Sequence, residues 1–187
     1  MIEINIDSSQ IERAQKLLSH IPGAFERARG AAISRTLQHM KAKAPQLASA
    51  KYYAKSGEIK RTIKTQRRGN NSGVMTSRGP KKSIADYKIS PTRQKLGRNQ
   101  GKLRGAVKRE GGLKSLNKAF LIPIGGRLLP YIRVGRGRWD IKRLMSPAIP
   151  QILGNEEITQ ELSQETSRYF SERLNHEVMR QLGGFAT

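Results

Sequence analysis

The basic residues of this sequence are concentrated in its middle. Residues 41–143 contain 28 of the chain's 36 lysines and arginines but only four acidic residues, which gives this region a net charge of +24. The two flanking regions together carry a net charge of −2. A chain that needed charge only for solubility would spread it evenly. The uneven distribution therefore predicts a basic central region between near-neutral helical ends, with a polyanion or an acidic protein as its partner.

The length of 187 residues favours one domain spanning residues 1–187, since two full cores would need a longer chain. Only 36% of the residues are hydrophobic, so we expect a modest core and extended loops or arms around it. The absence of cysteine excludes disulfides and thiolate metal sites. The N-terminus lacks a signal-peptide pattern, and no apolar run approaches the roughly 20 residues of a membrane helix. We therefore expect synthesis in the cytoplasm and no membrane partner.

The first 45 residues predict a strand and two helices. Isoleucines at alternate positions of 2–6 indicate a short half-buried strand, and Asp7 then caps a helix of about three turns. A second helix is expected to begin near Pro22 and to end at Pro45, because proline cannot continue a helix. The predicted buried face of this second helix is formed by Phe25, Ala28, Ala32, Thr36 and Met40.

Residues 69–117 are predicted to form a basic insertion that is rich in loops and arms. Turn-forming residues alternate there with lysine and arginine, and large apolar residues are few. We expect a short helix within 51–68, followed by two or three short strands around 74–75, 84–89 and 106–107. The Gly/Asn/Gln-rich stretch 91–105 cannot bury enough apolar surface to order itself, so it needs a partner.

Residues 118–134 give the strongest strand signal. Two apolar runs flank Gly125-Gly126, a pattern that predicts a β-hairpin. Because proline cannot donate a ladder hydrogen bond, Pro123 and Pro130 indicate that these strands lie at a sheet edge or end at the prolines.

A long helix closes the sequence. Asn155 is its predicted N-cap, Glu156 and Glu157 suit its first turn, and Gly183-Gly184 ends it. Its apolar stripe is predicted to comprise Ile158, Leu162, Tyr169, Leu174, Val178 and Leu182. The elements together predict an α+β fold: a small antiparallel sheet packed by N-terminal helices and a long C-terminal helix, with basic extended loops or arms.

The sequence contains no complete catalytic or cofactor motif. Ser115 and Lys118 have S-x-x-K spacing, but the SDN and KTG motifs that accompany a nucleophilic serine are missing. Gly135 and Gly137 are not followed by a nucleotide-binding pattern, which favours a tight turn. The three histidines are scattered, and the four acids of the basic region do not cluster as a metal-dependent nuclease requires. We therefore expect a non-enzymatic protein without cofactor or metal.

Two aromatic residues near the end of the basic region are of the type that stacks on nucleic-acid bases, Tyr131 and Trp139. A lone tryptophan between apolar segments is more typical of a core or interface position. Trp139 is therefore expected to be buried in the core or in an interface.

The C-terminal third resembles the phage minor tail protein Z family, the tail-completion or neck proteins of tailed phages. The resemblance is carried by a basic apolar strand, a small-residue-proline pair and a Pro-Gln-apolar-Leu-Gly-Asn segment that leads into the last helix. The matching positions are Ile141, Leu144, Ser146, Pro147, Pro150, Gln151, Leu153, Gly154 and Asn155. Residues 21–44, with Arg35 in an Ala-rich helix, are also similar to the opening helix of that family. About half of the chain is covered, and 69–117 matches only in being basic.

The resemblance implies a structural virion protein that acts in tail completion and head–tail joining at the neck. It implies a hexameric ring around the DNA channel, with other tail and neck proteins as neighbours, and it brings no catalytic residues.

The positive charges of the central region also predict which residues contact an anion. Possible contacts with genomic double-stranded DNA or an acidic partner are Arg67, Arg68, Lys81, Lys82, Arg93, Lys95, Arg98, Lys102 and Arg104. The alternative is that the same residues lie on a solvated face of the protein or pair with the acidic surface of another tail protein. A free basic nucleic-acid-binding protein is the alternative function, and a basic toxin or nuclease is disfavoured by the missing catalytic cluster.

Overall fold

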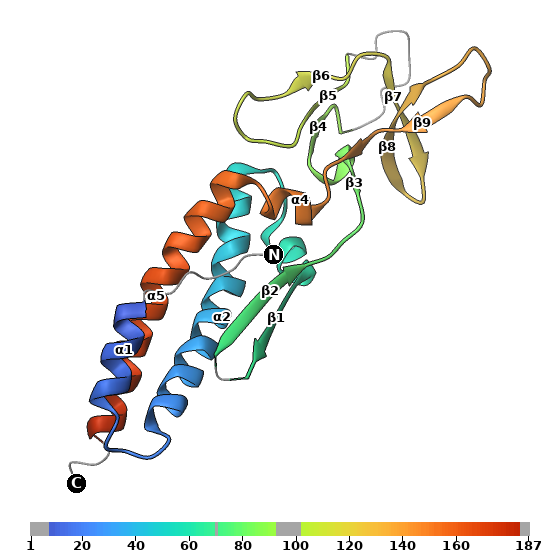
Figure 1. Ribbon diagram of the computed structural model, residues 1–187. Coiled ribbons are helices and arrows are strands. Elements are labelled where there is room, and N and C mark those ends of the chain that lie inside the picture. Colours follow the sequence, from blue (N-terminus) through green and yellow to red (C-terminus); the bar gives the residue numbers. More distant parts are fainter. Residues whose placement is uncertain (1–7, 70, 93–101, 184–187) are drawn as a thin grey trace.

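A computed structural model describes residues 8–69, 71–92 and 102–183. The chain forms an elongated molecule with helices at one end and short strands at the other (Figure 1). The strand predicted at 2–6 and its neighbour Asp7 lie outside the described residues.

Five helices and the first hairpin form one part of the molecule, the helical body. Its helices are α1 (Ser8–Leu17), α2 (Ala24–Lys51), α3 (Ser56–Thr62), α4 (Ile149–Leu153) and α5 (Glu156–Gly183). The long helices α2 and α5 pack against each other, and α1 packs on α5 (Figure 1). The hairpin of β1 (Ile63–Arg68) and β2 (Ser72–Ser77) packs on α2.

The described residues 82–92 and 102–146 form the other part, the β lobe. Strands β3 (Lys82–Ser83) and β10 (Met145–Ser146) pair near the body. A second sheet has the order β4 (Lys88–Ser90), β5 (Arg104–Ala106) and β6 (Lys114–Ser115). A third has the order β7 (Ala119–Ile124), β8 (Arg127–Arg133) and β9 (Ile141–Arg143), and every pairing is antiparallel. The predicted α+β class with a long C-terminal helix is confirmed, and its strands are divided among small separate sheets.

The hydrophobic core lies in the helical body. Its buried members are at or before Met75 and at or after Ile149, while the described part of the lobe adds only the partly buried Tyr87 and Val107. The predicted small-residue face of α2 is confirmed, because Ala28, Ala32, Thr36 and Met40 are buried and Phe25 packs at the margin.

The predicted end of the second helix at Pro45 is wrong. Helix α2 runs through Pro45 to Lys51. Proline lacks the N–H that would bond to Lys41, a loss that typically costs about 3 kcal/mol in a helix interior. Pro45 is fully buried, so packing of its ring against the core offsets that cost.

The 118–134 hairpin is confirmed as β7 and β8, with Gly125 and Gly126 at positive φ in the turn. Pro123 lies in the edge strand β7, as predicted. The expectation for Pro130 is wrong, because Pro130 lies inside the central strand β8. Pro130 lies opposite Leu144 and accepts a hydrogen bond from its N–H at 2.9 Å, but it cannot return one. The Leu144 carbonyl accepts instead from the Ile84 N–H at 3.3 Å, so it keeps a partner.

The remaining short elements differ in detail from the predictions. The helix expected within 51–68 is α3, and its chain continues directly into β1. Residues 84–89 form a 3₁₀ turn (Ile84–Asp86) followed by β4, rather than one strand. The side chains of Ser83 and Asp86 cap this turn, which interrupts an otherwise extended segment.

Candidate anion-binding surface

The β lobe carries many more cations than acids. Its described residues include fourteen lysines and arginines but only three acids: Asp86, Glu110 and Asp140. Within that described part, salt bridges involve only two of the cations, Lys82 with Glu58 and Arg127 with Asp86. The lobe therefore presents an unneutralised positive surface.

The nine predicted contacts do not form one patch. Arg67 and Arg68 lie on β1 of the helical body, whereas Lys102 and Arg104 lie at β5 in the lobe (Figure 1). The Arg67 guanidinium donates at 3.4 Å to the Gly30 carbonyl and at 3.4 Å to the Ser34 hydroxyl, so it is held against α2.

Lys82 is also less available than the sequence suggests. Its ammonium lies 2.9 Å from a Glu58 carboxylate oxygen. Four predicted contacts are exposed and form no salt bridge among the described residues: Arg68, Lys81, Lys102 and Arg104. Three others lie outside the described residues: Arg93, Lys95 and Arg98.

The exposure of Trp139 in the loop between β8 and β9 is a feature that the sequence prediction missed. Trp139 is 80% exposed, so the expectation of a core position is wrong for this chain. Val134 is also exposed, and Arg136 and Arg138, which precede the tryptophan, have exposed side chains. The alternation of arginine and glycine before the tryptophan was the available signal. The apolar segments on either side of Trp139 favoured a buried position instead.

Asp140 organises this loop. Its carboxylate accepts a hydrogen bond from the Gly137 N–H at 3.0 Å, and its carbonyl accepts one from the Val134 N–H at 2.8 Å. A Cβ on Gly135 or Gly137 would lie 2.3 or 2.7 Å from the same carboxylate. A side chain at either position would push the Asp140 carboxylate out of this place, which agrees with the tight turn that the sequence predicts.

The arginines complete the loop. The Arg133 guanidinium donates to the carbonyls of Gly137 and Arg138 at 3.2 and 3.3 Å. The Arg138 guanidinium lies 5.4 Å from the centre of the Trp139 ring, within the range of a cation–π interaction.

Residues 141–155, which carry the family-like pattern, connect the lobe to the body. Ile141 lies on β9, and the Leu144 N–H donates to the Pro130 carbonyl at 2.9 Å. The Pro147 carbonyl accepts from the Tyr87 hydroxyl at 2.7 Å.

The second half of this segment forms α4 and caps α5. Pro150 lies in the first turn of α4, and the Gln151 side chain accepts from the Ala148 N–H at 2.8 Å. Leu153 is buried, and Gly154 follows α4 directly. The Asn155 side chain accepts from the Glu157 N–H at 3.2 Å, which confirms the predicted N-cap.

Comparison with family models, curated proteins and solved structures found no match to this chain. The assignment of function therefore depends on its own residues.

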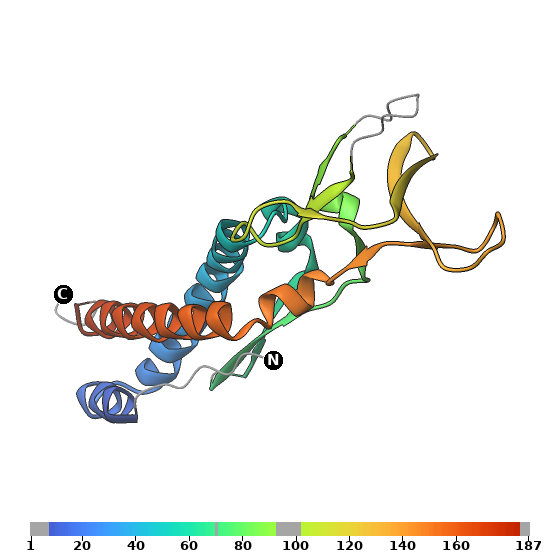
Figure 2. The ribbon, with the colours of Figure 1, turned by 90° about the horizontal axis from the view of Figure 1, so that it is seen from above.

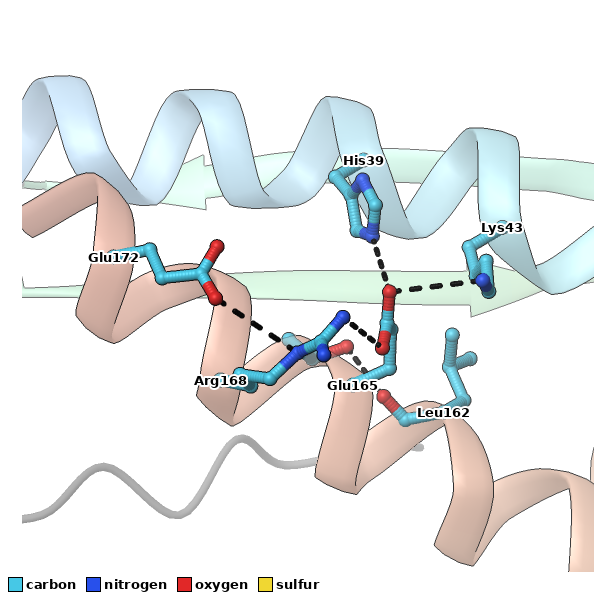
Figure 3. Close-up of polar contacts among 7 residues, drawn as sticks. His39, Lys43, Leu162, Glu165, Arg168 and Glu172 are labelled. Atoms are coloured by element: carbon cyan, nitrogen blue, oxygen red, sulfur yellow. Dashed lines mark hydrogen bonds and ion pairs between the residues drawn. The ribbon is translucent and has the colours of Figure 1, made fainter.

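A cluster of titratable side chains lies between α2 and α5, outside the lobe. One Glu165 oxygen lies 3.3 Å from His39 and 3.6 Å from Lys43, and the other accepts from Arg168 at 3.0 Å (Figure 3). The His39 ring stacks on Tyr169 with centroids 3.9 Å apart.

The ionisation of Glu165 indicates a structural role for this cluster. Partial burial raises the pKa of Glu165, but the hydrogen bond with His39 and the charges of Arg168 and Lys43 bring it below the usual 4.5. A general acid or base for neutral pH needs a pKa near 7. The Glu165 carboxylate instead stays ionised and links α5 to α2.

A second network joins the lobe to the body. Partial burial raises the pKa of Asp86, whereas hydrogen bonds from Arg127 and the Ser83 N–H bring it below its usual value. Burial and the neighbouring Asp86 and Glu58 charges raise the pKa of Tyr87 to about 12. Tyr87 therefore stays protonated and remains a hydrogen-bond donor to the body.

In the part of the chain that the structure describes, no three histidine or acidic side chains are placed to hold a metal ion. None of its described helices is long and apolar enough to cross a lipid bilayer.

Proposed function

We propose that this chain is a structural, non-enzymatic virion protein of a tailed phage that acts in tail completion and head–tail joining at the neck. In this role, copies form a ring around the DNA channel, with six subunits as the resemblance implies. Its other partners are neighbouring tail and neck proteins and, non-specifically, the genomic double-stranded DNA.

The observation that carries this proposal is the uneven division of the core. Leu103, Leu121 and Leu129 are the large aliphatic residues buried in the described part of the lobe, whereas the body contains an extended cluster. Burial of apolar surface is the main force that opposes chain entropy. A lobe with so few buried side chains gains further stability when neighbouring molecules cover it, as they do in an assembly.

The net charge of the chain indicates that such an assembly needs an anionic partner. Each copy adds a net charge of +22, so copies of this chain alone increase mutual repulsion. Double-stranded DNA carries about one charge per 1.7 Å of axis and neutralises such a surface without sequence preference. A ring also multiplies weak individual contacts, so modest affinity per subunit is sufficient.

The segment 141–155 supports the proposal at the level of residues. Where the lobe meets the body, Asn155 caps α5 and Gln151 caps α4. Pro150 lies in the first turn of α4. These roles give a physical reason for the pattern on which the resemblance depends.

The test is electron microscopy of virions made without this protein. We expect tails that assemble but fail to join heads productively. Re-expression of the wild-type chain should restore joining. Fully joined, normal particles in its absence would contradict the proposal.

The free nucleic-acid-binding protein is the second candidate, and it is favoured by the cation excess of the lobe. The two candidates differ in assembly. The mass of the purified chain, alone and with tail proteins, should reveal an oligomer or a complex if it is a virion component. A monomer in both conditions, with tight and steeply salt-dependent DNA binding, would favour the alternative.

A further inference from the structure

The β8–β9 loop displays the chain's single tryptophan at the surface. Trp139 is 80% exposed and Val134 is 61% exposed. In Figure 1 this loop extends from the lobe on the side away from the long helices. A large exposed aromatic side chain on a protruding loop is typical of a binding element.

The loop holds its shape without a partner. Asp140 accepts from the Gly137 N–H, Arg133 donates to two loop carbonyls, and Gly135 and Gly137 leave room for the Asp140 carboxylate. A preformed loop loses little conformational entropy on binding, so its exposed side chains contribute more fully to affinity.

The charges around Trp139 select an anionic partner. Arg136, Arg138 and Lys142 are exposed, and they form no salt bridge among the described residues. The nearby acid, Asp140, already accepts a hydrogen bond from the loop itself. The Arg138 guanidinium lies over one face of the Trp139 ring, so the loop offers the other aromatic face together with positive charge at one place.

We propose that the β8–β9 loop binds single-stranded nucleic acid, with Trp139 stacked on an unpaired base and Arg136 and Arg138 in contact with phosphates. Single strands expose flat base faces and regularly spaced anions together, which matches what the loop offers. A duplex hides its base faces in the stack. The wider cation excess of the lobe suits a polymeric anion better than a protein surface, which mixes both signs of charge. This role depends on the loop alone and holds whether the chain works in a virion or free.

The emission of the single tryptophan makes a direct test possible. The full-length protein is titrated with an oligo-dT strand, with a duplex of equal length and with heparin, which is a polyanion without bases. We expect oligo-dT to quench Trp139 emission through stacking. Heparin should bind without comparable quenching, and the duplex should quench less than the single strand.

Variants separate stacking from charge. Trp139→Ala should weaken oligo-dT binding about 5- to 100-fold, the range for one lost stacking contact, and Trp139→Phe should weaken it less. Each phosphate contact contributes about 0.7 to the salt slope for single strands, so the double variant Arg136→Ala/Arg138→Ala should lower it by about 1.4. The matched control is Arg61→Ala, an exposed arginine on α3, which should leave Trp139 quenching unchanged. Because Trp139 is exposed, its replacement should leave the circular dichroism spectrum and the melting temperature unchanged.

Several results would overturn the proposal. Equal oligo-dT affinity of wild type and Trp139→Ala would show that no base stacks there, and equal quenching by heparin would mean the same. A shift of Trp139 emission with anionic phospholipid vesicles but not with oligo-dT would assign the loop to a membrane surface. Loss of oligomers in Trp139→Ala, with unchanged oligo-dT binding, would assign it to a protein interface. None of these results decides the virion role, which the particle experiment tests separately.

Discussion

At the scale of single residues, Gly73 sets how closely β2 approaches α2. A Cβ at this position would lie 2.8 Å from the Leu37 Cδ1 and 3.0 Å from its Cγ. Leu37 is only 5% exposed, so its side chain has little room to move away. Gly57, in contrast, has nothing within 4 Å of the same added atom.

These two glycines provide a matched pair of variants. Gly73→Ala should overpack the contact with Leu37 and lower the free energy of unfolding by about 1–3 kcal/mol. Gly57→Ala, on the exposed surface of α3, should be neutral or raise it by up to about 1 kcal/mol through helix propensity. Urea denaturation followed by circular dichroism measures both. An unchanged midpoint for Gly73→Ala would mean that β2 lies farther from α2 than the structure places it.

At the scale of elements, the buried residues of both long helices recur every four positions. In α5 they include Ile158, Leu162, Thr166, Phe170 and Leu174. Those of α2 follow the same spacing and include Ala24, Ala28, Ala32, Thr36, Met40, Ala44 and Ala48. Rows of this kind favour packing in which the helices cross, and Figure 2 shows α2 and α5 crossing rather than running parallel.

This spacing explains one wrong choice in the predicted stripe of α5. The predicted stripe includes Tyr169, but the row of buried residues passes through Thr166 to Phe170. Tyr169 lies at the margin, stacked on His39. Two adjacent aromatic residues cannot both lie on one helix face. The path of α2 across α5 determines which of the two is buried, and the sequence did not specify that path.

The two aromatics should respond differently to truncation. Phe170 is 1% exposed, so Phe170→Ala should cost about 3–5 kcal/mol of unfolding free energy through the cavity it leaves. Tyr169→Ala removes a stacked pair at a half-buried position and should cost about 1 kcal/mol. Thermal and urea unfolding of the two variants checks the order. Equal costs would favour the assignment made from the sequence.

Local signals predicted the elements better than the pairing between them. Asn155, Gly125-Gly126 and the small residues of α2 act through their nearest neighbours, so the N-cap of α5, the hairpin and the α2 face were predictable. The course of α2 through Pro45 depends on burial that tertiary packing supplies. The exposure of Trp139 depends in the same way on a loop that Asp140 organises across several residues.

At the scale of the whole molecule, the basic region 41–143 is divided: its first part belongs to α2, α3, β1 and β2 of the helical body, and its second part belongs to the lobe. The sequence did not reveal this division, or how little core the lobe has. The described strands of the lobe are short, and β3, β6 and β10 contain two residues each. Short ladders over a small core open locally more easily than long packed helices. The helical body should therefore hold most of the cooperative stability.

Hydrogen exchange followed by mass spectrometry tests this division in the intact protein. Amides in α2 and α5 should exchange only through global unfolding, whereas those in β4 to β9 should exchange faster through local opening. Equal protection of β5 and α5 would show that lobe and body unfold as one unit.

Hydrogen exchange in the presence of a bound polyanion shows which part of the molecule forms the anion-binding surface. Heparin at about 100 times its dissociation constant should stabilise the structure that binds it by about 2.7 kcal/mol, which slows exchange there about 100-fold. If the unneutralised cations of the lobe form the binding surface, this slowing should be confined to the lobe and its connections. High salt should abolish it, because the attraction is electrostatic. Slowing that falls instead on α1 and the C-terminal half of α5, two segments in which acids and bases are nearly balanced, would move the anion-binding surface to the helical body. The lobe would then need another explanation for its charge.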